Sequence, residues 1–333
     1  MISIVMTGTG VYVPRNKVYN EEIDEHFESM GLNAHSLMEH LGRRKRYFIS
    51  EGENAITMCQ NAIDDCIKKN NIDPQTVDML IICTDTPEYL FPSNALKIVG
   101  MYGDKLKNVR VSFDLNCNCA GMVVGMNVAS KYMMSSDINR ALVIGCFCVS
   151  PIALWNDTVV YANLADAAAC VMLEKEESDV KRGFIDEESY IDGTYQKYIT
   201  FPKCGMSQVP LQSVYPNEKR LEWIPFSTDF LSERWAQIIE HLLERNQMLS
   251  NEIDHYVFSQ LSDNANVGTL KKLGVFPDGG KYHFLGKEYA YTGNTCPVLC
   301  LDRMWNMYSQ RGHKLIFCTV GAGYTALATL YQF

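Results

Sequence analysis

One cysteine in this chain occupies a position suited to a nucleophile. Cys119 lies in the segment Asp114–Met122, between an apolar stretch at 109–115 and a helical pattern at 122–134. Small residues follow it, so its sulfur can lie at the head of the helix, where unpaired N–H groups and the helix dipole favour a thiolate over a thiol. A thiolate held there can attack acyl thioesters. The alternative is a structural core cysteine, because the chain has 12 cysteines and free cysteines often act as small apolar residues.

The other reactive groups do not form a recognisable site. Two Cys-x-Cys pairs, Cys117/Cys119 and Cys146/Cys148, lack the Cys-x2-Cys spacing and nearby histidines of a zinc site, so we expect no metal. The Gly-x-Gly loop at 8–10 lacks the third glycine and the acidic residue of a dinucleotide-binding site, and we interpret it as a turn.

The composition is that of a globular protein. The chain has 333 residues, of which 47% are hydrophobic and 21% charged, which is enough for a sizeable core or for two fused halves. A formal net charge of −9 argues against general binding to nucleic acid or to anionic membranes. No apolar run approaches the roughly 20 residues needed to span a bilayer. Because the N-terminal segment has no signal-peptide features, we expect a reduced, cytoplasmic protein.

Three pairs of segments repeat at a single offset of 176 residues (for example 235 − 59 = 176). One pair consists of amphipathic helices and two pairs consist of apolar strands. The pairs are 59–67 with 235–243, 77–83 with 253–259, and 141–145 with 317–321. The chain is therefore predicted to contain two copies of one α/β unit, at 1–173 and 174–333, with helices covering both faces of apolar sheets. The same offset pairs Cys119 with Thr295, beside a Gly-Asn turn.

The segment 192–230 falls outside this repeat. It is rich in aromatic residues, methionine and proline. We expect a long excursion that caps a pocket or builds an interface, and the alternative is an ordinary surface loop with buried anchors.

Several motifs, in the same order along the chain, resemble those of the thiolase-fold condensing enzymes, and most closely β-ketoacyl-acyl-carrier-protein synthase III. They are Thr7–Pro14, Gly42–Arg46, Thr86–Ser93, Asp114–Met122, Gly293–Thr295 and Val320–Thr325. The resemblance covers nearly the whole chain. It implies an α/β thiolase-like fold in which two duplicated βαβαβ halves form a five-layer α-β-α-β-α sandwich. It also implies a homodimer that uses coenzyme A or acyl-carrier-protein thioesters as substrates and needs no other cofactor.

The resemblance also implies roles for individual residues. Cys119 would accept the acyl group, and Asn294 would donate a hydrogen bond to the thioester oxygen of a second, malonyl substrate. The backbone N–H groups of Cys119 and Ala322 would form the oxyanion hole, each lowering a barrier by roughly 3 kcal/mol. Phe91 would reach across the dimer and shape the neighbouring subunit's acyl pocket.

A group of basic residues is the expected contact for an acidic carrier protein. The resemblance assigns this contact to Arg43, Arg44 and Lys271, with Lys272 beside them. The alternative is that these charges form only a solvated surface.

Serine replaces the family's catalytic histidine. The strand at 254–258 is followed by Ser259-Gln260-Leu261-Ser262, where the family has His-Gln-Ala-Asn. Serine can donate one hydrogen bond, but it is not a base near pH 7. Decarboxylative condensation is therefore in doubt, and we expect the substitution Ser259→His to accelerate it.

Three other residues are candidates for the missing base. Asp85 falls where the related hydroxymethylglutaryl-coenzyme A synthases carry a catalytic glutamate, and it could act as a base if burial raised its pKa. The alternative for Asp85 is a capping or solvated loop residue. His255 and His283 are near Ser259 in the sequence, although a lone histidine is more often structural.

Two functions follow from these observations. The first is an acyl-thioester transferase or condensing enzyme that forms an acyl-enzyme on Cys119 and passes the acyl group to a carbon or other acceptor, in specialised lipid or polyketide biosynthesis. The second is a catalytically silent partner subunit of a heterodimeric condensing enzyme. A thiolase would need a second cysteine near the C-terminal Gly-x-Gly, and Cys318 lies in an apolar strand instead. The sequence leaves the acyl chain, the donor and the acceptor open.

Overall fold

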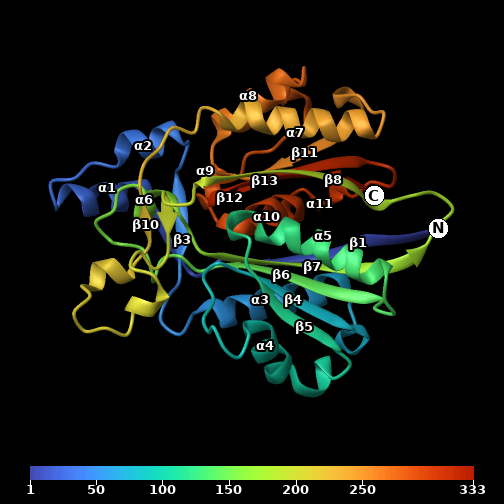
Figure 1. Cartoon of the computed structure of the whole chain (residues 1–333), viewed down its shortest axis with the longest axis horizontal. Coiled ribbons are helices and arrows are strands. Elements are labelled where there is room, and N and C mark those ends of the chain that lie inside the picture. The colour runs from blue at the N-terminus through green and yellow to red at the C-terminus, as the bar shows by residue number, and fades with distance from the viewer.

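Two stacked β-sheets form the centre of the fold, with helices between them and on their outer faces (Figure 1). The computed structural model describes residues 1–333, except for the side chain of Asp278. The first sheet has the strand order β1-β7-β6-β4-β5, and the second has the order β11-β12-β13-β8. The strands are β1 (Ile2–Tyr12), β7 (Ala167–Glu177), β6 (Arg140–Phe147), β4 (Met79–Cys83), β5 (Val111–Leu115), β11 (His255–Phe258), β12 (Lys314–Gly321), β13 (Gly323–Gln332) and β8 (Gly183–Tyr195).

The two sheets share one topology. The first sheet contains neighbouring strands in the order β1-β7-β6-β4. They correspond to neighbouring strands of the second sheet in the order β8-β13-β12-β11. In both series the first two pairings are antiparallel and the third is parallel. The first sheet continues with β5, which pairs with β4. The duplication predicted from the 176-residue offset is therefore confirmed.

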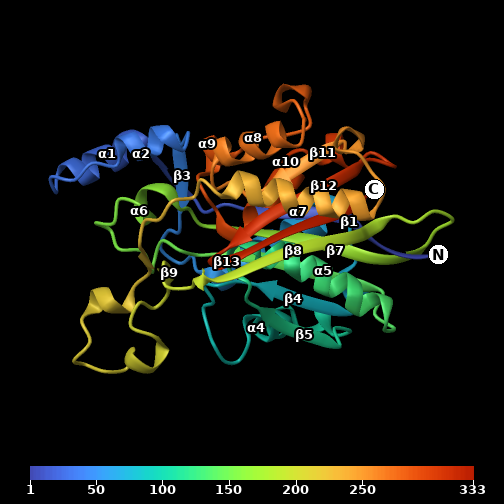
Figure 2. The same cartoon turned by 45° about the horizontal axis from the view of Figure 1, so that its top comes forward.

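Helices form three layers around these sheets (Figures 1 and 2). One outer layer covers the first sheet, a central layer lies between the sheets, and the other outer layer covers the second sheet. The layers are α3 (Ala55–Asn70) with α4 (Asn94–Tyr102), α5 (Gly121–Met134) with α10 (Cys296–Arg303), and α7 (Leu231–Arg245) with α8 (Asp263–Lys272). The predicted five-layer thiolase-like sandwich is confirmed.

The smaller elements lie mainly at the end of the sandwich opposite the chain termini (Figure 1). Two short strand pairs, β2 with β3 and β9 with β10, belong to them. Their bounds, with those of the remaining helices, are β2 (Asn16–Tyr19), β3 (Lys45–Phe48), β9 (Ile199–Thr200), β10 (Glu222–Trp223), α1 (Asn20–Glu28), α2 (His35–His40), α6 (Val160–Asn163), α9 (Gly286–Tyr289) and α11 (Trp305–Tyr308).

The central helix α5 is apolar on most of its circumference because both sheets pack against it. Its buried side chains share one core with strands of both sheets, and they include Met122, Val123, Met126, Ala129 and Met133. Gly125 allows α5 to approach β4 closely, since a Cβ at this position would lie 2.3 Å from the Cys83 sulfur. The outer helix α7 is instead amphipathic and buries one stripe of apolar residues. The turn that precedes α5 is thus held between the two halves.

The chain passes from the first sheet to the second between β7 and β8. β7 remains in the first sheet as far as Glu177, and β8 begins at Gly183. The predicted division after residue 173 therefore falls inside a strand, and the passage lies at 178–182. The predicted excursion at 192–230 also overlaps β8, which ends at Tyr195, and the chain rejoins the repeat where α7 begins.

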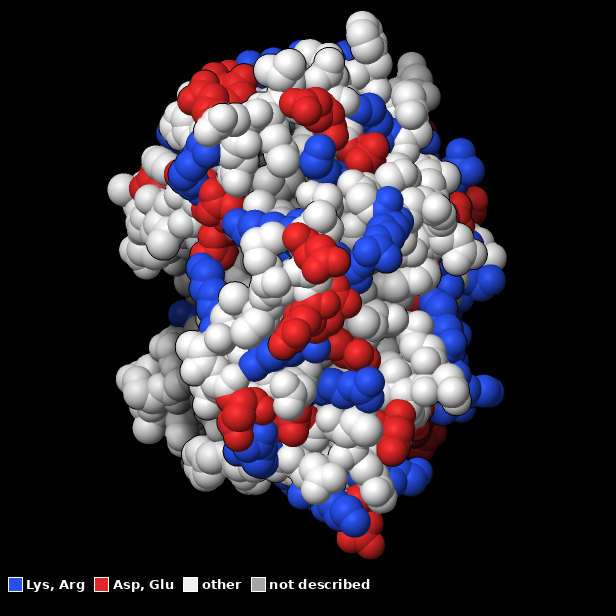
Figure 3. Space-filling model, turned by 90° about the vertical axis from the view of Figure 1, so that its right-hand side faces the viewer, with Lys and Arg blue, Asp and Glu red and all other residues white. Residues whose placement is uncertain are grey.

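Charges of both signs are mixed on the surface. Figure 3 shows acidic and basic side chains interleaved over the end of the molecule that carries both termini. Many charges form ion pairs, as Arg245 does with Asp186 at 2.7 Å and with Glu188 at 2.6 Å. Among the described residues, every helix is too short or too polar to cross a lipid bilayer. All 12 cysteines are free, and most of them are buried.

Candidate active site

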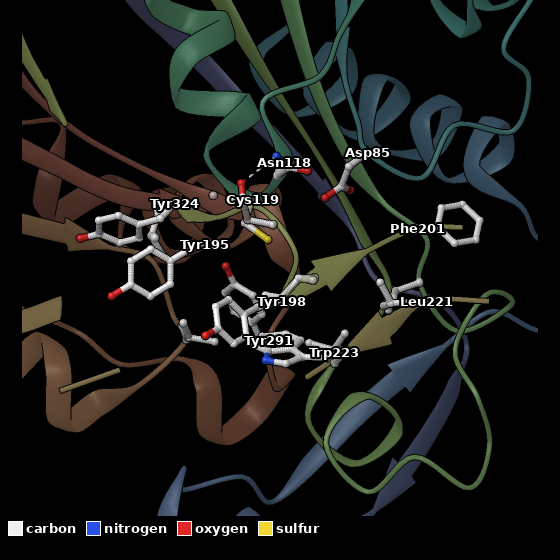
Figure 4. A pocket seen from close by; sticks show the side chains of 18 of the residues that line it. Asp85, Asn118, Cys119, Tyr195, Tyr198, Phe201, Leu221, Trp223, Tyr291 and Tyr324 are labelled. Carbon is white, nitrogen blue, oxygen red and sulfur yellow. Dashed lines mark hydrogen bonds between the residues drawn. The ribbon is translucent and has the colours of Figure 1, made fainter. Parts of the chain in front are cut away.

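A cavity of about 150 Å³ lies where the two halves and the excursion meet. The first half contributes its wall at Asp85 and Cys119, and the second half contributes the turn between β12 and β13. Figure 4 shows Cys119 and Asp85 on one side of this space, with aromatic side chains around it. The aromatic lining residues are Phe147, Tyr195, Tyr198, Phe201, Trp223, Phe226, Phe230, Tyr291 and Tyr324. The cavity is therefore a largely apolar chamber with a few reactive groups in its wall.

The excursion forms a large part of this wall. Its strands β9 and β10 pair Ile199 with Trp223, and both side chains line the cavity. The ring of Phe226 packs against those of Tyr195 at 5.5 Å and Tyr198 at 4.9 Å between centroids. Apolar side chains of the segment predicted to cap a pocket thus form part of the cavity wall.

Cys119 lies in the short 3-10 turn Asn118–Ala120, directly before α5. Asn118 has a φ of 49°, in the left-handed region that asparagine tolerates better than most non-glycine residues. Its side-chain amide donates a hydrogen bond of 3.1 Å to the carbonyl oxygen of Ala322 (Figure 4). The nucleophile turn and the β12–β13 turn are thereby fixed together, and Cys119 and Ala322 line the same cavity.

The Cys119 thiol is not ionised in the way the sequence predicted. Burial raises its pKa well above the ordinary value of a cysteine, the charge of Asp85 raises it further, and a hydrogen bond with Tyr291 lowers it. The helix terminus favours a thiolate, but the loss of solvation in this apolar wall outweighs that effect. This shift favours the thiol over the predicted thiolate in the resting protein, so a base that accepts the Cys119 proton would activate it.

Asp85 is the candidate for that base. It follows β4 and lines the cavity with Cys119, and Figure 4 shows its carboxyl group directed into the same space. Burial raises the pKa of Asp85 to about 6. Its Oδ1 is buried and makes no hydrogen bond with any described residue. The carboxyl group is thus not used as a cap, and near neutral pH it is an ionised acceptor for a proton.

Ser259 does not take the place of the histidine in the cavity. Its side chain is 0% exposed and lies behind the cavity wall. The Ser259 hydroxyl is 3.2 Å from the Tyr291 hydroxyl and 4.0 Å from the Cys296 sulfur. Tyr291, which does line the cavity, stands in front of it. Ser259, at the position predicted for the catalytic histidine, is therefore buried outside the cavity lining and contacts Tyr291 and Cys296.

This packing reverses the expectation for Ser259→His. An imidazole at position 259 would have to displace Tyr291 or Cys296, so we predict a loss of about 1–3 kcal/mol in the free energy of unfolding. The control Ser259→Ala removes only one hydroxyl, and it should cost about 1 kcal/mol or less. Urea unfolding of both variants measures this difference. Wild-type stability in Ser259→His, together with faster decarboxylation, would show that the histidine can still be accommodated.

Asn294 meets the nucleophile turn but does not present its amide to the cavity. The turn Gly293–Thr295 contacts the turn Asn118–Ala120, as the predicted pseudo-symmetry requires. The Asn294 side chain is buried, and its Nδ2 donates a hydrogen bond of 3.1 Å to the carbonyl oxygen of Cys146. Asn294 is not among the residues that line the cavity. One of the two Nδ2 hydrogens is thus used within the protein, and the side chain is buried outside the cavity lining.

The basic residues assigned to carrier binding separate into two groups. Arg43 is only 2% exposed, and its guanidinium donates to the carbonyl oxygens of Leu261 at 2.7 Å, Gln260 at 3.2 Å and Gly286 at 3.4 Å. The prediction that Arg43 binds a carrier is therefore wrong, because it holds the loop that follows Ser259. Arg44 and Lys271 are exposed.

The remaining candidates lie outside this cavity. Phe91 is 86% exposed, in the loop between β4 and α4. His255 stacks on Tyr308 with ring centroids 4.2 Å apart, and His283 is hydrogen-bonded to the Tyr308 hydroxyl at 2.8 Å. Both histidines therefore have structural contacts away from Cys119.

Tyr291 is a functional candidate that the sequence did not indicate. This residue lies three positions before Asn294, but it belongs to none of the motifs that carried the resemblance. The only signal was its proximity in the chain to the Gly-Asn turn. In a single sequence, that proximity does not distinguish Tyr291 from any other aromatic residue near a motif.

Solved structures share this architecture over nearly the whole chain. 3-Oxoacyl-[acyl-carrier-protein] synthase III from Aquifex aeolicus aligns with a TM-score of 0.85 at 20% identity, covering 99% of this chain and 100% of that one. The priming β-ketosynthase of the R1128 polyketide biosynthetic pathway gives a TM-score of 0.85 at 20% identity, covering 99% and 96%. The fold is thus that of the thiolase-fold condensing enzymes.

Sequence comparison identifies the family within that fold. Models of 3-oxoacyl-[acyl-carrier-protein] synthase III match residues 113–193, and models of its C-terminal part match 243–333, together just over half of the chain. β-Ketoacyl-[acyl-carrier-protein] synthase III of Clostridium novyi is 28% identical over 340 residues, covering 100% of this chain and 99% of the relative. The chain belongs to the 3-oxoacyl-[acyl-carrier-protein] synthase III family of condensing enzymes.

Proposed function

We propose that this protein is an acyltransferase that forms an acyl-enzyme on Cys119 and passes the acyl group to a carbon nucleophile or to another acceptor. One observation carries this proposal, which is that Cys119 and Asp85 line the same cavity. A buried thiol becomes a nucleophile when a nearby base accepts its proton, and Asp85 is ionised above about pH 6.

The acylation step uses groups of this chain only. The Cys119 proton passes to the Asp85 carboxylate while the sulfur attacks the thioester carbon. We assign the developing oxyanion to the backbone N–H groups of Cys119 and Ala322, each expected to contribute roughly 3 kcal/mol. When the carbon–sulfur bond of the donor breaks, the leaving thiolate takes the proton from Asp85, and the acyl group remains on Cys119.

We propose that the acceptor is activated by proton removal and not by loss of CO2. Ser259 and Asn294 are both buried and absent from the cavity lining, which argues against either side chain as a donor to a malonyl thioester. Asp85 remains in the cavity after acylation and can serve as the base a second time. This supports transfer to an acidic carbon or to an acceptor that is already activated.

The cavity and its surroundings support particular substrates and partners. Its aromatic wall suits an apolar acyl group, carried by coenzyme A or by an acyl carrier protein that contacts the exposed Arg44 and Lys271. Phe91 and Leu90, at 86% and 63% exposed, support a homodimer in which this loop reaches the neighbouring subunit.

Compartment and pathway are proposed on other grounds. The free cysteines fit a reducing compartment such as the cytoplasm. The relatives named as β-ketoacyl-[acyl-carrier-protein] synthase III and as a polyketide priming ketosynthase support a place in lipid or polyketide biosynthesis.

Intact-mass measurement after incubation with acyl-coenzyme A donors of increasing chain length tests the proposal. We expect the wild-type mass to increase by a single acyl group with at least one apolar donor. Subsequent addition of a malonyl thioester should release CO2 no faster than a reaction without enzyme. An unmodified mass with every donor, together with co-purification of an active relative, would support the silent-partner alternative.

A further inference from the structure

A buried phenol occupies the space between the nucleophile and the position of the missing histidine. Tyr291 is 2% exposed, yet its side chain lines the cavity beside Cys119. Its hydroxyl is 3.2 Å from the Ser259 hydroxyl. Figure 4 shows Tyr291 across the cavity from Asp85, with Cys119 between them. The phenol therefore reaches the place where the serine side chain is too short.

The backbone fixes Tyr291 in this position. Its N–H donates to the carbonyl oxygen of Asn163 at 3.0 Å, and its carbonyl accepts from the N–H of Ala165 at 3.0 Å. This isolated bridge joins the segment before the Gly-Asn turn to the segment before β7. A side chain held by such pairing, in a packed apolar cluster with Cys296 and Phe147, has little freedom to leave Cys119.

The surroundings of Tyr291 keep it a hydrogen-bond donor. Burial raises the pKa of the Tyr291 phenol well above its ordinary value, and neighbouring Cys119 and Cys296 raise it further. Its hydroxyl is therefore protonated throughout the physiological range. When Ser259 donates to the Tyr291 oxygen, the phenolic hydrogen is free to point toward Cys119. Cys119 packs against the cluster that contains Tyr291, and the phenol lowers the pKa of the Cys119 thiol.

We infer that Tyr291 is a catalytic residue, because its hydroxyl donates a hydrogen bond to the Cys119 sulfur as negative charge develops there. This inference rests on the proposed acyl-enzyme. The proton of Cys119 still goes to Asp85, and Tyr291 keeps its own proton throughout. Ser259 is a positioning residue, because it orients the phenol and does not touch the reacting atoms.

The variant Tyr291→Phe tests this role, because it removes the hydroxyl and keeps the ring. A hydrogen bond to a charged group favours that charge by about tenfold to a hundredfold. We therefore expect the rate of acylation by a reactive acyl-coenzyme A to fall by about that factor. The alkylation of Cys119 by iodoacetamide at pH 8, followed by peptide mass mapping, should slow by roughly threefold to tenfold. This smaller effect is expected because a thiolate of higher pKa is also intrinsically more reactive, which offsets part of the loss.

A matched control separates this effect from the loss of any buried phenol. Tyr256 is fully buried in β11, outside the cavity, and its hydroxyl donates to the carbonyl oxygen of Ser250 at 2.8 Å. Tyr256→Phe should leave the alkylation of Cys119 unchanged. Ser259→Ala should slow that alkylation in the same direction as Tyr291→Phe but by less.

The alkylation readout also separates the inference from the proposed function. If the wild-type protein accepts no acyl donor while Tyr291→Phe is alkylated more slowly than the wild type, that pair of results would support the hydrogen bond and reject the acyl-enzyme. Alkylation at the wild-type rate in folded Tyr291→Phe would overturn the inference, even if acylation were observed. If Tyr291→Phe does not fold, the Ser259→Ala measurement decides, and an unchanged rate there overturns it.

Discussion

The variant Cys119→Ala will accept no acyl group from any acyl-coenzyme A donor that labels the wild-type protein. The reason is positional, since Cys119 is the cysteine whose side chain lies in the cavity wall at the start of α5. Alanine removes the sulfur and leaves the turn free to form. Intact-mass measurement gives the result directly, with circular dichroism to verify the fold.

Two other thiols provide the matched controls. Cys117 and Cys204 are partly accessible, whereas the remaining cysteines apart from Cys119 are buried. Cys117→Ala and Cys204→Ala should be labelled as the wild type is. Labelling that persists in Cys119→Ala and maps to either of these residues would mean that the cavity is not the site of acylation.

The variant Asp85→Asn will be acylated about 10²- to 10⁴-fold more slowly at pH 8, because an amide of the same shape cannot accept the Cys119 proton. Single-turnover measurement of acylation with a saturating donor gives this rate. The variant keeps the cavity shape, so donor binding should change much less than the rate.

A stability measurement verifies that this loss is chemical. The pKa of Asp85 is raised in the folded protein from 3.8 to about 6, so its ionisation destabilises the fold as the pH rises through that window. Removing the charge should therefore stabilise Asp85→Asn by roughly 1–3 kcal/mol at pH 8, with no gain below about pH 4. A variant that is slow and also less stable would indicate damage to the site and not loss of a base.

The parts of the fold that depend on local pattern were predictable from the sequence. The 176-residue offset was recognised from helical and strand periodicity. The structure contains the corresponding duplication, in the form of two sheets with the same strand order. The turn containing Cys119 and the meeting of that turn with the Gly-Asn turn followed from the same offset. The motifs that carried the family resemblance are short segments, which a single sequence displays completely.

The chemistry of the site was less predictable because it depends on distant segments. The helix terminus beside Cys119 is visible in the sequence, but the burial that raises the pKa of the thiol is not. Nor are the opposing effects of Asp85, whose charge raises that pKa, and of Tyr291, which lowers it. An arginine such as Arg43 is expected on the surface, and only the packed fold shows that its side chain is buried. The direction in which Asn294 points is likewise decided by the Cys146 carbonyl.

The pH dependence of acylation in wild type and Asp85→Asn tests the central claim most directly. We predict that the wild-type rate rises tenfold per pH unit to a pKa near 6 and then levels off, as Asp85 becomes able to accept the Cys119 proton. In Asp85→Asn the plateau should disappear, and the rate should continue to rise into the alkaline range with the ionisation of the thiol. An identical plateau near pH 6 in both proteins would contradict the account, since another group would then be the base.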